Sequence, residues 1–174
     1  MSQVSFENRT VIVTGAGNGL GKAYALDLGL RGAKVVVNDL GGAVDGSGSG
    51  STPADEVVKE IIANGGEAVA NYDSVATKEG GESIVQTAID NFGTVDAVVN
   101  NAGILRDKSF ANMSEDELSL IIDVHLKGTF FVSQPAFKVM KENSYGRIVN
   151  VASPSGLFGN FGQSNYGAAK MGIV

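Results

Sequence analysis

Residues 10–21 read TVIVTGAGNGLG and carry the strongest signal for the fold. The β-branched run predicts a short buried strand, and the glycines behind it predict a tight turn that opens a helix. Glycines at such a junction let the backbone approach a pyrophosphate, whose charge the free N–H groups at the helix start can bind. The alternative is a turn that only needs positive φ. We expect a dinucleotide site that includes Gly15, Gly17, Asn18, Gly19, Leu20 and Gly21.

The rest of the chain alternates short β-branched runs with longer amphipathic stretches, as βαβ units on a parallel sheet do. Strands are expected at residues 10–14, 34–39, 68–72, 95–100 and 147–151. Helices are expected at about residues 19–31, 54–64, 79–92 and 114–143. Ser114 and Glu117 form a capping-box signature at the start of the last helix, and Pro135 predicts a kink or break within it. The pattern indicates an α/β fold.

Composition limits the class of protein. The chain has 174 residues, 43% hydrophobic and 18% charged, which fits one soluble domain spanning residues 1–174. No Cys and a single His predict no metal site, and the net charge of -6 argues against nucleic acid. No apolar run is long enough for a membrane span.

Residues 41–53 are rich in Gly and Ser and predict a mobile surface loop. Because the sequence stops at Val174 within a helical stretch, we expect further C-terminal strands to be missing.

Asp39 stands at the end of the second expected strand, 18 residues after Gly21. At this spacing an acidic side chain accepts hydrogen bonds from the adenosine ribose hydroxyls. Its carboxylate would repel a 2′-phosphate, and no Lys or Arg is adjacent, so NAD is favoured over NADP. The alternative role is a turn former at the strand end.

Ser153, Tyr166 and Lys170 form the candidate catalytic group. Ser153 follows the fifth expected strand, and Tyr166 and Lys170 are four residues apart, on one face of a helix. The Lys170 ammonium there would favour the phenolate form of Tyr166, so this side chain could exchange a proton with an alcohol or carbonyl. A Tyr and a Lys at this spacing also occur often by chance.

Three motifs together resemble the short-chain dehydrogenase/reductase family: TGAGNGLG at 14–21, NNAG at 100–103, and Ser153 followed by YGAAK at 166–170. The resemblance implies a Rossmann-type doubly wound parallel sheet in strand order 3-2-1-4-5. It implies that Tyr166 acts as general acid/base, that Lys170 holds the nicotinamide ribose and assists Tyr166, and that Ser153 orients the substrate oxygen. It further implies that NAD is bound by the residues of the glycine turn and Asp39 together with Asp73, Ser74, Asn101, Ala102, Gly103, Tyr166 and Lys170. A homodimer or homotetramer is also implied.

One position departs from the family pattern. His125, in VHLKG at 124–128, occupies the place of the usual catalytic Asn. The family Asn supports a water-mediated proton relay through its backbone, so a His could preserve the bend while altering the side-chain contacts. A purely structural histidine is the alternative.

Further stretches, among them VVNDLGG at 36–42 and GLFGNFGQSNY at 156–166, are similar to a narrower group. This group comprises the (3R)-hydroxyacyl-CoA dehydrogenase domains of peroxisomal multifunctional enzymes type 2 and their bacterial single-domain relatives. It implies oxidation of an acyl-CoA-like substrate, in the cytoplasm of a bacterium or the peroxisome of a eukaryote. Alternatives are another alcohol or ketone, such as a 3-oxoacyl carrier protein or a hydroxysteroid, or a non-catalytic nucleotide-binding fragment. Phe158 and Phe161 either contact an acyl chain or pack under the loop.

Overall fold

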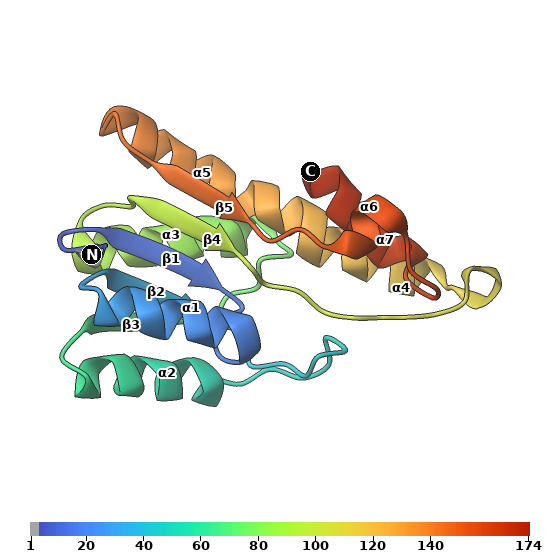
Figure 1. Cartoon of the computed structure of the whole chain (residues 1–174), viewed down its shortest axis with the longest axis horizontal. Helices are drawn as coiled ribbons and strands as arrows, with labels where there is room; N and C mark the ends of the chain where they lie inside the picture. The colour runs from blue at the N-terminus through green and yellow to red at the C-terminus, as the bar shows by residue number, and fades with distance from the viewer. Residues whose placement is uncertain (1–3) are drawn as a thin grey trace.

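Five parallel strands form one sheet in the order β3-β2-β1-β4-β5 (Figure 1). The computed structural model describes residues 4–174 of the chain. The strands are β1 (Thr10–Thr14), β2 (Lys34–Asn38), β3 (Glu67–Asn71), β4 (Ala97–Asn100) and β5 (Arg147–Asn150). The predicted strands and their order are confirmed, with each end within two residues of its expected position.

Helices connect the strands. The α-helices are α1 (Gly19–Leu30), α2 (Thr52–Ala63), α3 (Lys78–Phe92), α4 (Glu115–Ile121), α5 (Gly128–Glu142), α6 (Pro154–Phe158) and α7 (Ser164–Ile173). A 3₁₀ turn, η1 (Phe110–Asn112), precedes α4, and a π-helical segment, η2 (Ile122–Lys127), joins α4 to α5. The sequence did not predict η1, η2 or α6. Within residues 4–174, no helix combines the length and apolar character that a membrane crossing needs.

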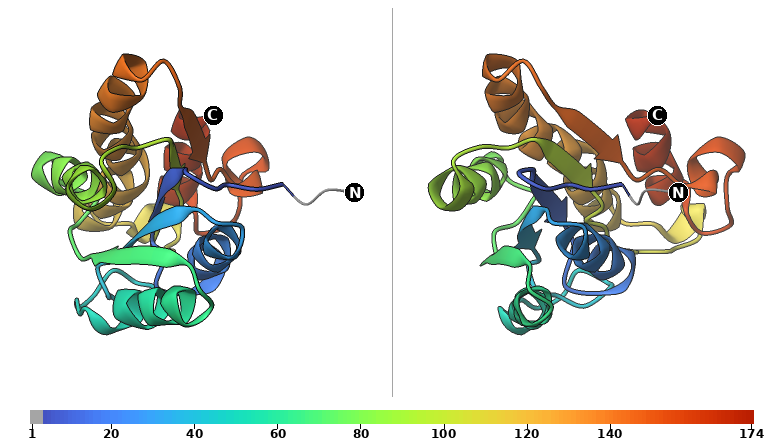
Figure 2. Two further views of the ribbon diagram at one scale, coloured as in Figure 1. Left: turned by 90° about the vertical axis from the view of Figure 1, so that its left-hand side faces the viewer. Right: turned by 60° about the vertical axis from the view of Figure 1, so that its left-hand side comes forward.

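The strand β1 is buried on both faces of the sheet, where successive side chains point to opposite sides, whereas the residues of the edge strand β5 are exposed. Val11 and Val13 of β1 face one core cluster with α1 and α2, whereas Ile12 faces a second cluster with α3 and α5. Figure 2 shows α3 (green) and α5 (orange) on one side of the sheet and α1 (blue) on the other. This two-faced burial explains the nearly continuous apolar strands in the sequence.

The long helical stretch is interrupted, but not at Pro135. Its start is as expected, because the Ser114 side chain accepts the backbone N–H of Glu117 and the Glu117 carboxylate accepts that of Ser114. The helix departs from α geometry at η2, and α5 then continues through Pro135. Proline lacks the N–H that would bond the carbonyl of Phe131. Gly81 of α3 packs against this carbonyl, so the neighbouring helix fills the gap that the proline leaves.

Candidate functional site

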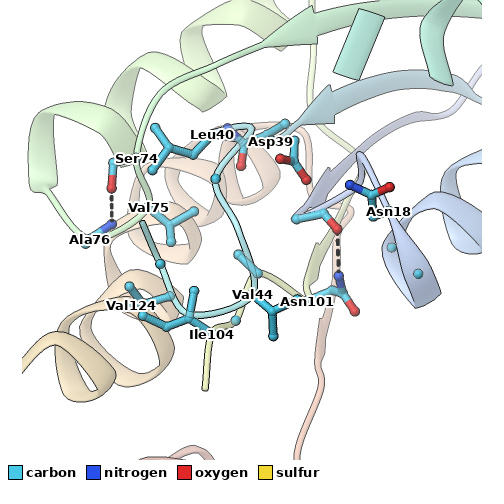
Figure 3. Close-up of a pocket in the computed structure, with 18 of the residues that line it drawn as sticks. Asn18, Asp39, Leu40, Val44, Ser74, Val75, Ala76, Asn101, Ile104 and Val124 are labelled. Atoms are coloured by element: carbon cyan, nitrogen blue, oxygen red, sulfur yellow. Dashed lines mark hydrogen bonds between the residues drawn. The ribbon is translucent and has the colours of Figure 1, made fainter. Parts of the chain in front are cut away.

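A pocket of about 360 Å³ lies at the carboxyl ends of the strands (Figure 3). From β1 the following strands are added first on one side (β2, β3) and then on the other (β4, β5), so the strand order switches between β1 and β4. Ligands of doubly wound folds bind at such a switch point. Many of the predicted cofactor residues line the pocket: Gly15, Asn18, Gly19, Leu20, Gly21, Asp39, Asp73, Ser74, Asn101, Ala102 and Gly103. Gly17, Ser153, Tyr166 and Lys170 are outside this lining. Apolar side chains that the sequence did not single out complete it: Leu40, Val44, Val75, Ile104, Leu120 and Val124.

The turn after β1 requires glycine at specific positions. Gly15 has φ +63 and lies so close to Ala102 that a Cβ would be 2.7 Å from its Cα. A Cβ on Gly21 would overlap the carbonyl of Gly15. Both positions therefore exclude a side chain, and both glycines line the pocket.

Asp39 joins this turn to the segment that follows β2. Its carboxylate accepts the backbone N–H of Gly17 at 2.8 Å and that of Gly41 at 2.7 Å. A carboxylate offers about four acceptor sites, so two backbone bonds leave capacity for a ligand hydroxyl. Asp39 thus holds the turn in place and also presents unused acceptor sites of its carboxylate to the pocket.

Two side-chain networks hold the pocket walls. Thr14 Oγ1 accepts the backbone N–H groups of Asn101 and Ala102, and the Asn101 amide donates to the carbonyl of Thr14. On the other side, the Asn38 amide donates to the Asn71 side chain and to the Asp73 carbonyl, which fixes the segment after β3. Sequence reasoning missed Asn38 and Asn71; their signal was a polar residue ending an otherwise apolar strand.

The glycine-rich segment 41–50 runs across the pocket mouth. The Leu105 N–H donates to the carbonyl of Val44 at 2.9 Å, and the Arg106 guanidinium donates to the carbonyl of Asp45. Val44 itself lines the pocket (Figure 3). We call residues 41–50 the strap, because they connect the end of β2 to the segment after β4. The sequence predicted a mobile loop here, and the structure adds these two attachments.

Lys170 and Tyr166 meet beside the pocket. Lys170 is 4% exposed, and its Nζ donates to the carbonyl of Val151 at 2.6 Å. The same Nζ lies 5.6 Å from the centroid of the Tyr166 ring. Burial lowers the pKa of Lys170 to about 8, so the side chain is mostly an ammonium at neutral pH yet can exchange a proton close to it.

Ser153 is the N-cap residue of α6, the short helix that packs on α7. Its Oγ accepts the backbone N–H of Ser155 at 3.2 Å. Gly156 of α6 lies against the backbone of Lys170 and Met171, so a side chain there would push the two helices apart. This packing brings the segment that carries Ser153 next to the helix that carries Tyr166 and Lys170.

Asn165 fixes the start of α7 and was missed by sequence reasoning. It is 1% exposed, and its amide donates to the carbonyls of Arg106 and Glu117. Its Oδ1 accepts the backbone N–H of Tyr166 at 2.8 Å. An Asn directly before the Tyr was the available signal. The neighbouring Phe158 and Phe161 are exposed, at 85% and 90%.

The sequence matches the model of the short chain dehydrogenase family over residues 9–174. The chain is 60% identical over 171 residues to the peroxisomal hydratase-dehydrogenase-epimerase of Saccharomyces cerevisiae, which is 98% of this chain and 19% of that protein. It is 57% identical over 173 residues to the peroxisomal multifunctional enzyme type 2 of Mus musculus, covering 99% of this chain and 23% of that protein.

Solved structures agree with the sequence matches. The crystal structure of a short chain dehydrogenase from Mycobacterium avium superposes with a TM-score of 0.88 at 48% identity, covering 96% of this chain and 60% of that one. The chain thus spans less than two thirds of each of these proteins. Since the family match runs through the glycine turn, the wall at Asn101 and helix α7, the chain belongs to the short chain dehydrogenase family.

Proposed function

We propose that the chain forms the catalytic part of an NAD-dependent dehydrogenase that oxidises a (3R)-3-hydroxyacyl-CoA to the 3-oxoacyl-CoA. The observation that carries the proposal is the pairing of Tyr166 with a buried Lys170 beside a pocket at the carboxyl edge of the sheet. The substrate class rests on the resemblance to hydroxyacyl-CoA dehydrogenase domains, which the names of the yeast and mouse relatives support.

The pocket residues fit NAD. Gly15 and Gly21 let the turn pack closely against Asn101 and Ala102, where a Cβ would collide, and such a tight turn brings the N–H groups of the helix start within reach of a pyrophosphate. The free acceptor sites of Asp39 suit ribose hydroxyls, and its charge opposes a 2′-phosphate. Asp73 and Ser74 line the pocket wall that suits an adenine ring. NAD, when bound there, supplies the acceptor for the hydride that the substrate loses.

The protein's own groups move the proton. Tyr166, as a phenolate, takes the proton of the substrate hydroxyl while the C–H electron pair leaves with the hydride, so that a carbonyl forms. The nearby Lys170 ammonium favours the phenolate by its charge. Ser153 donates a hydrogen bond to the substrate oxygen and orients it.

A Tyr166→Phe variant tests the function. We expect kcat for NADH formation to fall about 10²- to 10⁴-fold, the usual contribution of a general acid or base, while calorimetric NAD affinity changes little. Tyr145→Phe is the matched control, because Tyr145 packs under the Arg9 guanidinium, 3.9 Å from the ring centroid, before β5 begins. Turnover that survives in Tyr166→Phe would remove the proposed role.

The substrate is tested separately with purified protein and NAD. We expect (3R)-hydroxyacyl-CoA to be oxidised with a higher kcat/KM than the (3S) isomer, a 3-hydroxyacyl carrier protein or a hydroxysteroid. Preference for the carrier protein or the steroid would reassign the substrate. NAD binding without turnover of any of them would indicate a nucleotide-binding module.

We also propose assembly as a homodimer or homotetramer through α5 and α7. Phe130 and Phe137 are exposed on α5, two turns apart, as an apolar contact surface requires. Light scattering of the purified protein measures the assembly.

A peroxisomal location in a eukaryote follows the names of the relatives, and a cytoplasmic one in a bacterium remains a prediction.

A further inference from the structure

His125 is the single histidine of the chain and lies in the middle of the π-helical segment η2. A π turn inserts one residue into an α-helix and so redirects the side chains within it. His125 is thereby turned inward and is only 3% exposed. A polar ring in this position needs partners to offset the loss of water.

The imidazole connects the pocket wall to the candidate catalytic Tyr. Its Nε2 lies 2.8 Å from the carbonyl oxygen of Ile104 and 3.1 Å from the backbone nitrogen of the same residue. Ile104 lines the pocket. The ring also stands perpendicular to that of Tyr166, with centroids 5.1 Å apart. One side chain therefore contacts both the cofactor pocket's wall and the residue proposed to move the proton.

The ring has little freedom to move. A Cβ on Gly103 would be 3.1 Å from Nδ1 and would overlap Cε1, so the ring packs directly on the backbone there. Thr129 Oγ1 donates to the backbone carbonyl of His125 at 2.8 Å and holds the helix turn that carries it. A ring fixed from several sides can in turn fix its neighbours.

The imidazole is neutral at working pH. Burial is the main cause that lowers the pKa of His125 to about 4; the bond to the Ile104 carbonyl opposes this shift and the charge of Lys170 adds to it. The neutral ring carries one proton. A proton on Nε2 lets the ring donate to the carbonyl of Ile104 at 2.8 Å, whereas a proton on Nδ1 leaves Nε2 to accept the backbone N–H of Ile104 at 3.1 Å; we assign the proton to Nε2 because its contact is the shorter. Nδ1 is buried and has no hydrogen-bond partner within residues 4–174. The ring thus has no proton to pass on from Nδ1.

We propose that His125 is a positioning residue, whose imidazole holds the Tyr166 ring at a fixed angle to the Gly103–Ile104 wall of the pocket and takes no part in proton transfer. This inference rests on the proposed function, because it assigns Tyr166 the chemistry. It explains why a polar ring is buried here: the hydrogen bond to Ile104 anchors it, and its perpendicular contact supports the tyrosine.

Two variants separate the two contacts. His125→Gln places an amide near the position of Nε2 and keeps the bond to Ile104, but it loses the ring. His125→Phe keeps a ring beside Tyr166 and loses the bond. We expect each to lower kcat about 10-fold, the worth of one such contact, and His125→Ala to lower it about 100-fold. NAD affinity should change less than about threefold, and the midpoint of the acidic limb of the pH profile of kcat should not move.

The tautomer is tested independently of activity. Because the chain has one histidine, ¹⁵N labelling of histidine gives a single pair of ring signals. We expect the neutral Nε2–H form at every pH above about 5.5. An Nδ1–H form, or titration at the ordinary pKa of histidine, would overturn the proposal.

The kinetic outcomes are also decisive. If Gln and Phe variants are as inactive as Ala, or if the pH profile loses its acidic limb, His125 transfers protons instead. If all three keep wild-type kcat while unfolding at lower urea, the residue is only structural. Tyr166→Phe is measured alongside. Activity retained in that variant removes the proposed function, whereas activity lost there with unaffected His125 variants removes only this inference.

Discussion

Replacing Lys170 with Met should change how the stability of the protein depends on pH. Burial lowers the pKa of Lys170 from its ordinary 10.5 to about 8 in the folded state. Each pH unit of difference corresponds to about 1.4 kcal/mol. Keeping this side chain charged in the fold therefore costs about 3 kcal/mol at pH 7.

The direction of the effect follows from proton binding. Between pH 8 and 10.5 the unfolded chain holds the Lys170 proton more tightly than the folded protein does, so the free energy of unfolding rises with pH in this window. Below pH 8 both states are protonated, and above 10.5 both are neutral. Met has no proton to lose and lacks this rise.

Urea unfolding of wild type and Lys170→Met at several pH values from 7 to about 10.5 measures the effect. Loss of the bond to Val151 shifts the difference between the two proteins by a constant of about 1 to 3 kcal/mol. On top of this constant, we expect wild type to gain about 3 kcal/mol over the variant across the window. Lys141→Met, on the exposed end of α5, is the matched control and should show no such change.

A difference between wild type and Lys170→Met that stays constant with pH would refute the reasoning, because it would mean that Lys170 is not desolvated in the fold. Activity provides the second measurement. The variant should lose NADH formation even where it is the more stable protein at pH 7, since the ammonium beside Tyr166 is gone.

Three further substitutions test the pocket. Gly21→Ala should weaken NAD binding more than about 10-fold by calorimetry, because its Cβ overlaps the Gly15 carbonyl; unchanged affinity would show that this turn does not contact the cofactor. Asp39→Asn should lower the free energy of unfolding in urea by about 1 to 3 kcal/mol, because the NH₂ group of the new Asn would face a backbone N–H donor. The same variant should show a smaller ratio of NAD affinity to NADP affinity. An unchanged ratio would contradict the role of Asp39. Gly46→Ala should speed NAD release measured by stopped flow. An Ala at φ +82 is strained and its Cβ would lie 2.9 Å from the Ile104 side chain, so we expect the strap to detach. Gly65→Ala, with φ +84 and open space around it, is the control, and a similar rate in both variants would count against a role for the strap.

The sheet could be predicted from sequence because its signals are local. The TVIVT run and its counterparts are apolar on both faces, and each ends at a glycine, aspartate or asparagine that marks the strand's end. The strand order came from the family resemblance, since alternation alone does not order strands. The α6 helix escaped prediction because five residues that start with proline and include glycine have no helical periodicity.

The site was only partly predictable. The glycines after β1 could be predicted, because a tight turn between a strand and a helix needs backbone conformations that glycine adopts easily. The roles of Asn38, Asn165 and His125 could not, because they depend on partners that lie far away in sequence. His125 meets Ile104 across 21 residues, and Asn165 meets Arg106 across 59. The π geometry of η2 likewise has no local signature. The same holds for the strap, whose glycine-rich composition indicates mobility but whose attachments lie after β4.

The strap has an evolutionary consequence, because Val44 and Asp45 are bound through their carbonyl oxygens. Every residue type supplies such an oxygen, so neither attachment selects a side chain at these two positions. What selection can act on is the number of residues that span the gap and the glycines with positive φ that set the path, at 41, 46 and 48. Homologous enzymes should therefore keep the length and glycine spacing of this segment while its other residues drift, and a single insertion should be tolerated less well than several substitutions.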